Sequence, residues 1–525
     1  MNDWTVSLGK PSDPAFVRDT LNLRQAMTDT PDLSSCNPIV LDGVSLTCAQ
    51  LVEAAHQKSK VAITESGRNR IIQGRKVVQS VAASGEPGYG ITTGVGSQKD
   101  FAIAADNVQD YNRRLARAHS THVGGAVLPK SRVRAALIIL VNEFSLGLSG
   151  VSEPLVQLIT DQINGATMPE VSSYGTVGAA DLIPMSQIAN WLQDMPKAQE
   201  FGIPGPKETL SLINTNAITL ATGAEVLMEA RSILELANLS LAFSLEAFRG
   251  NLNSISEKVN LAHQRSGQAQ VSADVRHLLR NSKLWEDGQA RRIQDPLSFR
   301  CASQIQGALL ELLDRAVDVW DQELNSVTDN PIVDVDSQCV RSHGNMDSTR
   351  MTLAIDGLRQ AFAKTLDIAG ERLHKQQWTE FSGLPTGFSD ANSPLGGVQF
   401  LNLGHLAASL ITSAKIWAAP SLLLSVGQLA DGVEDTAGHA FHSIADFERI
   451  LEAARLVLSI EIIVSIWAIN KRGLEASALG EGLREHATRI TPMLPIGKEG
   501  LEVFSIEPIV ETLRSLSKHQ NSGSK

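Results

Sequence analysis

The segment DFERILEAARLVLSIEIIVSIWAIN, residues 446–470, carries the strongest structural pattern in the chain. Its apolar residues recur at helical spacing and become almost continuous over Leu456–Ile469, a run whose one charged residue is Glu461. This run of about 14 residues is too short to span a bilayer, which requires about 20 apolar residues. The pattern therefore predicts a helix that is buried on all sides, and such a helix needs a bundle of other helices around it.

The rest of the chain supplies those other helices. Strand-like alternation is limited to the region around Pro38–Leu46, and Gly and Pro gather in loops such as residues 84–96 and 174–184. We therefore predict an all-α protein with functional loops at the ends of long helices. Helical apolar spacing with many Ala and Leu residues occurs in Arg132–Phe144, Leu210–Phe248, Cys301–Asn325, Thr352–Thr379 and Gly404–Ile416.

The chain contains no fixed-period repeat and no linker that would divide it. We expect an N-terminal segment (residues 1–39), a single domain (residues 40–515) and a polar tail (residues 516–525). Within the domain, residues 40–215 are rich in loops and residues 216–515 form the helical bundle. Wide apolar helix faces favour self-association, because a second copy completes their burial.

Composition and charge narrow the class of protein. Of 525 residues, 43% are hydrophobic and 20% charged, so the chain can bury a large core and is not disordered by composition. Lys and Arg number 46 against 57 Asp and Glu, and the net charge of −11 disfavours nucleic acid, whose partners carry a basic face. Four cysteines without a CxxC pair, and an N-terminus without a signal-peptide pattern, predict a cytoplasmic protein with reduced thiols.

The loop Gly88–Gly96 places a phenol among four glycines: it reads Gly-Tyr-Gly-Ile-Thr-Thr-Gly-Val-Gly. The chain has three tyrosines, Tyr89, Tyr111 and Tyr174, so a tyrosine in a reactive setting has few rivals. With a lowered pKa, a phenol in such a loop can serve as a general base. The alternative is a tyrosine that packs over a turn.

Three further polar segments are of chemical interest. His119 and His122 can share a helix face and bind a metal, but no third ligand of matching spacing follows, so we predict no metal site. Arg300 opens a long apolar helix, where a guanidinium can clamp a carboxylate; the alternative is an intramolecular salt bridge. For Glu434–Asp435 the alternative is a helix cap.

Taken together, these segments resemble the histidine and phenylalanine ammonia-lyase family in order and wording, over roughly residues 40–515. The resemblance implies an almost entirely α-helical fold with a central long-helix bundle. It also implies a homotetramer whose active sites are shared between subunits. The matching motifs are Tyr89–Gly94, Ala118–Ser120, Ser149–Val151, Leu212–Asn214, Gln294–Cys301, Thr328–Pro331, Ser382–Pro385 and Glu434–Asp435.

The family's built-in electrophile, a methylidene-imidazolone ring formed from Ala-Ser-Gly, is where this chain departs. Residues 175–184 read Gly-Thr-Val-Gly-Ala-Ala-Asp-Leu-Ile-Pro, which matches the family on both sides but is one residue short. Ala179 and Ala180 supply neither the serine that loses water nor the glycine nitrogen that closes the ring, so we predict that the chain uses no such cofactor. The Ala-Ser-Gly triad at Ala83–Gly85 lies outside this loop and is interpreted as coincidence.

Other positions near the electrophile also differ from the family, whereas the loop tyrosine and the arginine are retained. The pattern indicates that the surroundings of the ring changed and that the base and the carboxylate clamp did not. The replacements are Leu297 for a tyrosine, Thr215–Asn216 for Gly-Thr, Met346–Asp347 for the Phe-His of the bacterial histidine enzymes and Thr436 for a histidine.

This combination favours a substrate with a quaternary ammonium. Such a group has no lone pair to add to an electrophile, and it needs no activation because it leaves as a neutral amine. The chain resembles the ergothionase branch of the superfamily, which eliminates trimethylamine from ergothioneine, a thiolated histidine betaine, to give thiourocanate. The resemblance implies that Tyr89 is the catalytic base, that Arg300 holds the carboxylate and that Asn214 adds a hydrogen bond.

Further contacts are expected at the ring and at the leaving group of the substrate. Glu434 stands where histidine-specific relatives meet the imidazole ring, so we expect it to hold the ring N–H. Lys375 and Glu380 are further candidates for the ring end, with solvated helix faces as the alternative. A trimethylammonium needs an anionic or aromatic cradle, for which the candidates are Met346, Asp347 and His119.

Three other functions remain open. The first is a methylidene-imidazolone-dependent ammonia-lyase or aminomutase whose triad is incompletely written at Ala179–Ala180. The second is a catalytically silent homologue that serves as a structural or binding partner. The third is a cofactor-free lyase or isomerase that acts on another betaine, such as hercynine.

Overall fold

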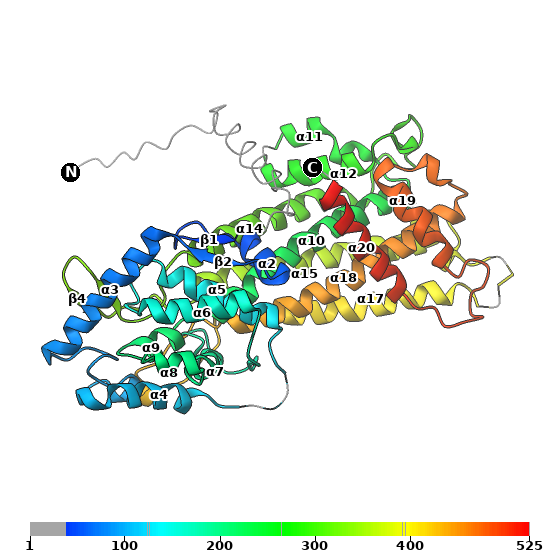
Figure 1. Ribbon diagram of the computed structural model, residues 1–525. Coiled ribbons are helices and arrows are strands. Elements are labelled where there is room, and N and C mark those ends of the chain that lie inside the picture. The colour runs from blue at the N-terminus through cyan, green and yellow to red at the C-terminus, as the bar shows by residue number, and fades with distance from the viewer. Residues whose placement is uncertain are drawn as a thin grey trace, which may run out of the picture.

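The computed structural model describes residues 38–523, except residues 123, 125, 264, 391 and 394. Of the expected N-terminal segment, residues 1–37 lie outside the described residues. Helices dominate the described part of the chain, which confirms the all-α fold predicted from the sequence (Figure 1).

Long helices that run side by side form the central bundle (Figure 1). The helix that contains the segment 446–470 packs against three of the others. All of its residues from Val457 to Ile469 are buried. The prediction of a helix buried on all sides is therefore confirmed. The long helices are α10 (Ala217–Phe248), α14 (Ala302–Glu323), α15 (Thr349–Gln377), α17 (Val398–Trp417) and α18 (Ala440–Lys471).

Shorter helices gather at one end of the bundle, on the left of Figure 1. They are α2 (Cys48–Gln57), α3 (Glu65–Ser84), α4 (Val108–His119), α5 (Lys130–Phe144), α6 (Glu153–Gly165), α7 (Leu182–Gln193), α8 (Pro196–Glu200) and α9 (Glu208–Ile213). Two small sheets accompany them: β1 (Ile39–Leu41) pairs in parallel with β2 (Val61–Ile63), and β3 (Ile332–Asp334) pairs antiparallel with β4 (Cys339–Arg341).

The remaining helices lie along the bundle and at its other end. They are α11 (Glu257–Leu261), α12 (Ser266–Leu278), α13 (Leu297–Arg300), α16 (Thr379–Ser382), α19 (Glu481–Ile490) and α20 (Glu507–Gly523). Helix α20 extends into the segment expected to be a polar tail. Short 3₁₀ turns occur at Gly96–Gln98, Ala105–Asn107, Leu252–Ile255, Lys283–Trp285, Thr386–Phe388, Ala430–Gly432, Ala476–Ala478 and Thr491–Met493.

The helix predicted over Leu210–Phe248 is interrupted. Helix α9 ends and α10 begins on either side of residues 214–216, which form a short non-helical link. The backbone of this link bonds to another segment, because Asp181 N donates to Thr215 O at 2.8 Å. The prediction of one continuous helix was wrong because apolar spacing continues across a break that hydrogen bonds to distant segments impose.

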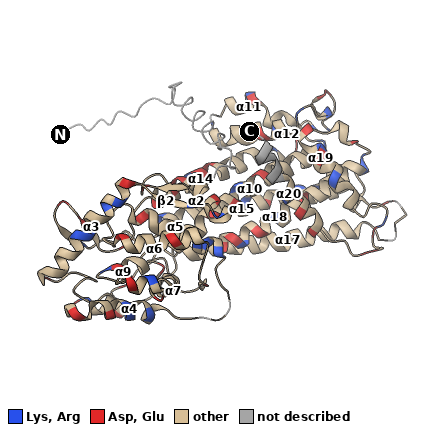
Figure 2. Cartoon of the chain, in the orientation of Figure 1, with Lys and Arg blue, Asp and Glu red and all other residues tan. Residues whose placement is uncertain are grey.

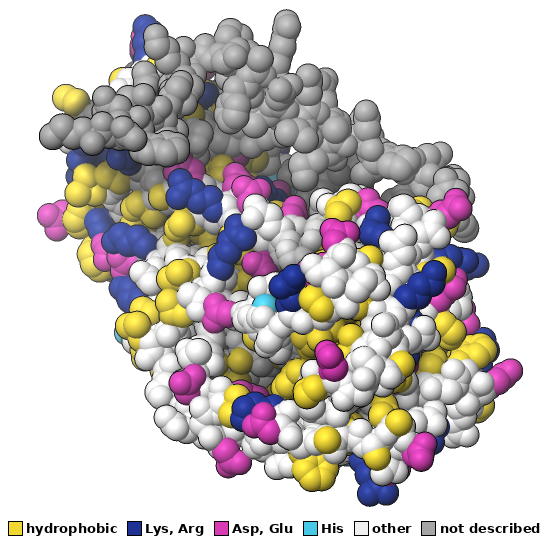
Figure 3. Space-filling view, turned by 90° about the vertical axis from the view of Figure 1, so that its left-hand side faces the viewer, with side chains coloured by type: hydrophobic (Ala, Val, Ile, Leu, Met, Phe, Trp, Pro, Cys, Tyr) yellow, Lys and Arg dark blue, Asp and Glu magenta, His cyan; other side chains and the backbone are white. Residues whose placement is uncertain are grey.

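Charges of both signs are interspersed over the helices, and much of the central bundle is uncharged (Figure 2). Figure 3 looks onto the end that carries α3 and α4, where hydrophobic side chains lie between scattered charges of both signs. Among the described residues, no helix is both long and apolar enough to cross a membrane.

A buried ion pair braces the bundle near the last turns of α15. Arg372 of α15 binds Glu461 of α18 in bidentate fashion, with Nε–Oε1 at 2.6 Å and Nη2–Oε2 at 2.9 Å. Ser240 and Ser244 of α10 each donate to the same carboxylate at 2.6 Å. The side chains of the pair are 1% and 0% exposed, so each charge depends on the other for compensation.

We expect Arg372→Met to lower the free energy of unfolding by about 3–5 kcal/mol, because it leaves Glu461 as a buried charge without its counterion. The double variant Arg372→Met/Glu461→Leu removes both charges and should recover much of that loss. Thermal unfolding followed by circular dichroism measures both effects. A double variant that melts no higher than Arg372→Met alone would contradict this account of the pair.

Candidate active site

A pocket of about 420 Å³ opens at the end of the bundle where the shorter helices gather. Its walls come from the loop 88–96, helices α4, α7 and α9, the loop 175–184 and the segment that precedes α18 (Figure 1). Of the residues predicted from the sequence, the pocket brings together Tyr89, His119, Ala179, Asn214 and Glu434. Further lining residues, which the motifs did not reveal, include Ser97, Gln98, Tyr111 and Arg114.

Tyr89 sits in a tightly hydrogen-bonded turn. Gly88 O accepts from the backbone N–H groups of Ile91 and Thr92, both at 2.9 Å. Gly90 has a φ of +66°, a conformation that a glycine adopts without strain. The Tyr89 hydroxyl oxygen accepts a hydrogen bond from Gly96 N at 3.0 Å, and this bond fixes where the phenol oxygen lies.

A second tyrosine, Tyr111 of α4, lines the same pocket. Burial raises the pKa of Tyr111, a hydrogen bond from Val95 N–H opposes the rise, and the nearby Tyr89 adds to it. Two consecutive backbone N–H groups therefore bond to the two phenol oxygens: that of Val95 to Tyr111 and that of Gly96 to Tyr89. Helical spacing is the signal that finds Tyr111 in the sequence, because it lies about two turns before His119 on one face of α4.

His119 and Glu434 are held by backbone contacts. His119 Nδ1 lies 2.9 Å from Leu115 O, and because a carbonyl oxygen can only accept, Nδ1 carries the hydrogen and a neutral ring keeps its lone pair on Nε2. Glu434 pairs through the backbone with Leu429, whose N–H donates to Glu434 O at 3.0 Å. Helix α18 begins only at Ala440, so the alternative of a helix cap does not apply to Glu434.

Asn214 projects from the link between α9 and α10, and a neighbouring turn fixes its amide. Its Nδ2 donates to Asn330 O at 3.1 Å. Asn330 Oδ1 accepts from His343 N at 2.8 Å, and His343 Nε2 donates to Asp329 O at 2.9 Å. The turn at Thr328–Pro331, one of the segments that match the family motifs, therefore has a specific effect: it positions Asn214.

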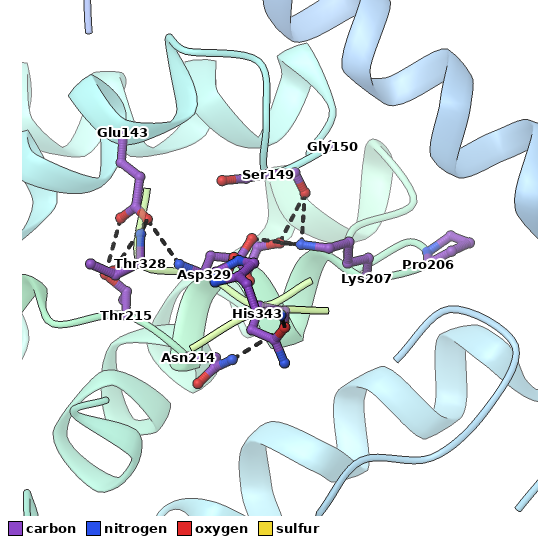
Figure 4. A network of polar contacts seen from close by, with 12 residues as sticks. Glu143, Ser149, Gly150, Pro206, Lys207, Asn214, Thr215, Thr328, Asp329 and His343 are labelled. Carbon is purple, nitrogen blue, oxygen red and sulfur yellow. Dashed lines mark hydrogen bonds and ion pairs between the residues drawn. The ribbon is translucent and has the colours of Figure 1, made fainter. Parts of the chain in front are cut away.

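The carboxylate of Glu143, at the end of α5, lies beneath that turn (Figure 4). Oε1 accepts from Thr328 N at 2.7 Å and from Asp329 N at 3.2 Å, and Oε2 accepts from Thr215 Oγ1 at 3.0 Å. Burial, followed by repulsion from Asp329, raises the pKa of Glu143 to about 7 despite these hydrogen bonds. One carboxylate thus ties together the two segments that hold Asn214.

A buried ammonium balances Asp329 on the other side of the turn (Figure 4). Lys207 Nζ donates to Asp329 Oδ2 at 2.6 Å, to Ser211 Oγ at 2.9 Å and to Ser149 O at 3.0 Å. Both charged side chains are 0% exposed. Because the three N–H groups meet three acceptors, the ammonium is satisfied and anchors the turn to α9 and to the loop after α5.

The loop 175–184 does not fit the family's electrophile. Neither Ala179 nor Ala180 carries the hydroxyl that the ring-forming dehydration requires. The amide placed to close a ring onto the Ala179 carbonyl is Asp181 N, and it donates to Thr215 O at 2.8 Å instead. The residues present therefore do not fit the group.

Met346 and Asp347 lie beside this loop but not among the residues that line the pocket. Asp347 pairs through the backbone with Ala179, and Met346 O accepts from Asn216 Nδ2 at 2.9 Å. The Asp347 carboxylate accepts from Thr349 N at 3.0 Å and from Thr349 Oγ1 at 3.1 Å. It is thus engaged at the start of α15.

The structure separates Arg300, Lys375 and Glu380 from the pocket and places them at the opposite end of the bundle. Helix α15 meets the pocket loop at its first residues, where Ser348 Oγ donates to Gly178 O at 2.7 Å. The same helix meets α13 near its last turns, where Arg372 Nη1 donates to Ser298 O at 3.2 Å. At 1.5 Å per residue these two contacts lie roughly 35 Å apart, so Arg300 cannot reach a ligand at Tyr89 of its own chain.

The end that carries Arg300 is rich in guanidinium groups. Arg249 Nη2 donates to Gln289 O at 2.8 Å and Arg472 Nη2 donates to Ser382 O at 2.6 Å, so these charges are bound to backbone carbonyls rather than to carboxylates. Burial, followed by repulsion from Arg291 and Arg249, lowers the pKa of Arg472 to about 10. A region of repelling positive charge suits an anionic group such as a carboxylate.

Comparison with known proteins gives the family. Residues 46–490 match the aromatic amino acid lyase family. The chain belongs to this family. Among relatives known by sequence, the histidine ammonia-lyases of Caldanaerobacter subterraneus subsp. tengcongensis and of Treponema denticola are 28% and 26% identical to it. The two matches cover 83% and 92% of this chain, and 88% and 99% of the relatives.

Solved structures place the fold in the same family. The crystal structure of the ergothioneine-degrading enzyme ergothionase from Treponema denticola, in complex with desmethyl-ergothioneine sulfonic acid, has a TM-score of 0.84 at 26% identity and covers 92% of this chain and 99% of its own. Histidine ammonia-lyase from Trypanosoma cruzi has a TM-score of 0.80 at 25% identity, with 93% and 96% covered. These findings confirm the fold and family expected from the sequence and support a carbon–nitrogen lyase.

Proposed function

We propose that this chain eliminates trimethylamine from ergothioneine, a histidine-type betaine, to give thiourocanate. The observation that carries the proposal is the pairing of Tyr89, positioned in the pocket, with a loop 175–184 that does not fit the family's electrophile. The likeness to the Treponema denticola ergothionase supports the same substrate.

The elimination needs one base and no electrophile. The Tyr89 oxygen, as phenolate, takes a proton from the β-carbon, and the electrons of that C–H bond form the Cα–Cβ double bond. The Cα–N bond breaks, and its electron pair stays on nitrogen. Trimethylamine leaves as a neutral molecule, so no group has to protonate or activate it. Each turnover leaves a protonated Tyr89, which loses its proton before the next.

The pocket offers the polar groups that an imidazole-type ring requires. In the proposed complex, Glu434 accepts a hydrogen bond from the ring N–H and Asn214 contributes a further hydrogen bond. Both residues line the pocket together with Tyr89. His119 and Tyr111 lie on the α4 side of the same cavity, where a ring face and an imidazole can surround a trimethylammonium.

The carboxylate clamp comes from a second copy of the chain in this proposal. Helix α17 exposes Leu406 and Ile416, and the segment after it exposes Leu423 and Leu424, so this side presents apolar surface that association would bury. We propose a homotetramer in which the Arg300 end of one copy meets the Tyr89 pocket of another. The same contact would bring Lys375 and Glu380 toward the ring end of the substrate.

Two alternatives predict different observations. A methylidene-imidazolone-dependent ammonia-lyase would have an intact mass lower than that of the sequence by two water molecules, and it would deaminate histidine, tyrosine or phenylalanine. A catalytically silent homologue would have the unmodified mass and turn over neither amino acids nor betaines. An enzyme with the unmodified mass that prefers hercynine would keep the mechanism and change the substrate.

The direct test is turnover of ergothioneine by the purified protein. We expect release of trimethylamine and appearance of a conjugated product that absorbs in the near ultraviolet. Tyr89→Phe should reduce kcat by about 10²–10⁴-fold, the usual contribution of a general base, while ergothioneine still binds. Deamination of histidine, tyrosine or phenylalanine in place of betaine turnover would overturn the proposed reaction. A Tyr89→Phe variant with a near wild-type rate would show that Tyr89 is not the base.

Mixed oligomers test whether the site is shared. Tyr89→Phe and Arg300→Gln are each expected to be inactive alone. When the two variants are co-refolded in equal amounts, about a quarter of the sites combine an intact Tyr89 from one copy with an intact Arg300 from another, so about a quarter of wild-type activity should return. If both residues acted within one chain, no mixed oligomer would contain an intact site and the mixture would stay inactive.

A further inference from the structure

The polar network beneath the pocket has a feature that a purely structural support does not require. Glu143 is fully buried, yet its carboxylate bonds to two separate segments that meet at Asn214 (Figure 4). One is the turn at Thr328, whose neighbour Asn330 accepts from the Asn214 amide. The other is the link that contains Thr215, the residue directly after Asn214. A change at this carboxylate therefore reaches Asn214 from two sides.

We propose that Glu143 is a positioning residue of the active site: its ionised carboxylate holds Asn214 in place through Thr215 and the 328–330 turn, and uptake of a proton by Glu143 loosens that hold. The inference rests on the proposed function for the identity of the substrate only. The network itself would act in the same way for any ligand that contacts Asn214.

The hydrogen-bond directions explain why the two charge states differ. An ionised Glu143 can only accept, and it has donors in Thr328 N at 2.7 Å, Asp329 N at 3.2 Å and Thr215 Oγ1 at 3.0 Å. A protonated carboxyl has to donate one bond, and the acceptors within reach are the hydroxyl oxygens of Thr215, at 3.0 Å, and Thr328, at 3.3 Å, of which Thr215 is the nearer. The Thr215 hydroxyl must then turn toward Thr328 Oγ1, which lies 3.3 Å away and already accepts from Asn216 N at 3.3 Å.

The charged groups around Glu143 leave its ionised and its protonated carboxyl close in free energy. Asp329 repels the ionised form, and Lys207 is engaged with Asp329 and with α9 rather than with Glu143. His343 is neutral in its contacts, because Nδ1 accepts from Asn345 N at 3.0 Å and Nε2 donates to Asp329 O at 2.9 Å.

A second buried pair completes the charged surroundings. Arg75 Nη1 and Glu208 Oε1 lie 4.0 Å apart. Glu208 accepts from Ser152 N at 2.9 Å and from Gly205 N at 2.6 Å, so its carboxylate is bound by backbone N–H groups. With burial added to the repulsion from Asp329, the pKa of Glu143 rises to about 7, and its charge changes in the neutral range.

Protonation of Glu143 is expected to lower the rate of catalysis. Above the pKa of Glu143 the ionised carboxylate keeps all its accepted bonds and Asn214 is held; below it the network rearranges. We expect the wild-type kcat/KM to fall as the pH is lowered through about 7, where Glu143 takes up its proton. Glu143→Gln presents an amide N–H toward Thr215, as the protonated acid presents its O–H. It should therefore lower kcat/KM about tenfold at about pH 8 and about twofold or less at about pH 6.

Two further variants separate positioning from folding. Thr215→Val removes the hydroxyl that Glu143 bonds and should reproduce the loss at high pH, whereas Thr215→Ser keeps it and should restore the wild-type profile. Thr222→Val is the matched control: Thr222 is buried in α10 and its hydroxyl bonds only to Ile218 O at 2.8 Å among the contacts of the described residues, so its kinetics should not change.

The deciding measurement is a double-mutant cycle with Asn214→Ala. If Glu143 acts through Asn214, Glu143→Gln should reduce kcat/KM no further in the Asn214→Ala background. The cycle can be run on whichever substrate the enzyme turns over, so failure of ergothioneine as substrate leaves this test intact. Independent, multiplicative effects of the two substitutions, or a Glu143→Gln variant with the wild-type pH profile, would overturn the inference. An infrared titration in which the carboxylic-acid band of the wild type is unchanged by Glu143→Gln would do the same.

Discussion

The length of α15 is the constraint on which the function of this chain depends. Its 29 residues span about 43 Å, with the Tyr89 pocket at one end and the element that carries Arg300 at the other. The bidentate pair between Arg372 and Glu461 and the packing of α18 against α10, α15 and α17 hold the bundle together. Because Tyr89 and Arg300 lie toward opposite ends of this bundle, the proposed chemistry requires a second copy to supply the carboxylate clamp.

A second constraint operates locally, where α9 stops and α10 starts. Residues 214–216 interrupt the hydrogen bonds of a continuous helix, and because Thr215 and Asn216 are buried, other polar groups of the chain have to replace those bonds. Glu143, the Thr328 hydroxyl and the Asp181 amide supply the replacements. The same bonds that satisfy the broken helix therefore set the direction of Asn214. Local stability and the geometry of the pocket are two effects of one network.

Sequence patterns and structure agree where the information is local. Apolar periodicity predicts α18 and the other long helices, because a buried face leaves its spacing in the chain. The family motifs single out Tyr89, His119, Asn214 and Glu434, and all four residues line one pocket. Apolar periodicity does not predict the break at residues 214–216, because hydrogen bonds to distant segments impose it. No motif identifies Glu143 as a residue that positions Asn214. Nor does the order of motifs show that Arg300 stands at the far end, because that depends on how long helices run in space.

The shortened loop 175–184 shows how the chain can lack an electrophile without loss of its scaffold. The Asp181 carboxylate accepts from Thr219 N at 2.8 Å and from Thr219 Oγ1 at 2.6 Å, and so it caps the first turn of α10 from within the core. Burial raises the pKa of Asp181, and the bonds from Thr219 oppose the rise, which makes this contact costly to remove. The loop thus has a structural task that is independent of any ring. Replacement of the residues that form the family's electrophile leaves the pocket walls in place, and the proposed betaine substrate suits such a pocket because its leaving group departs without activation.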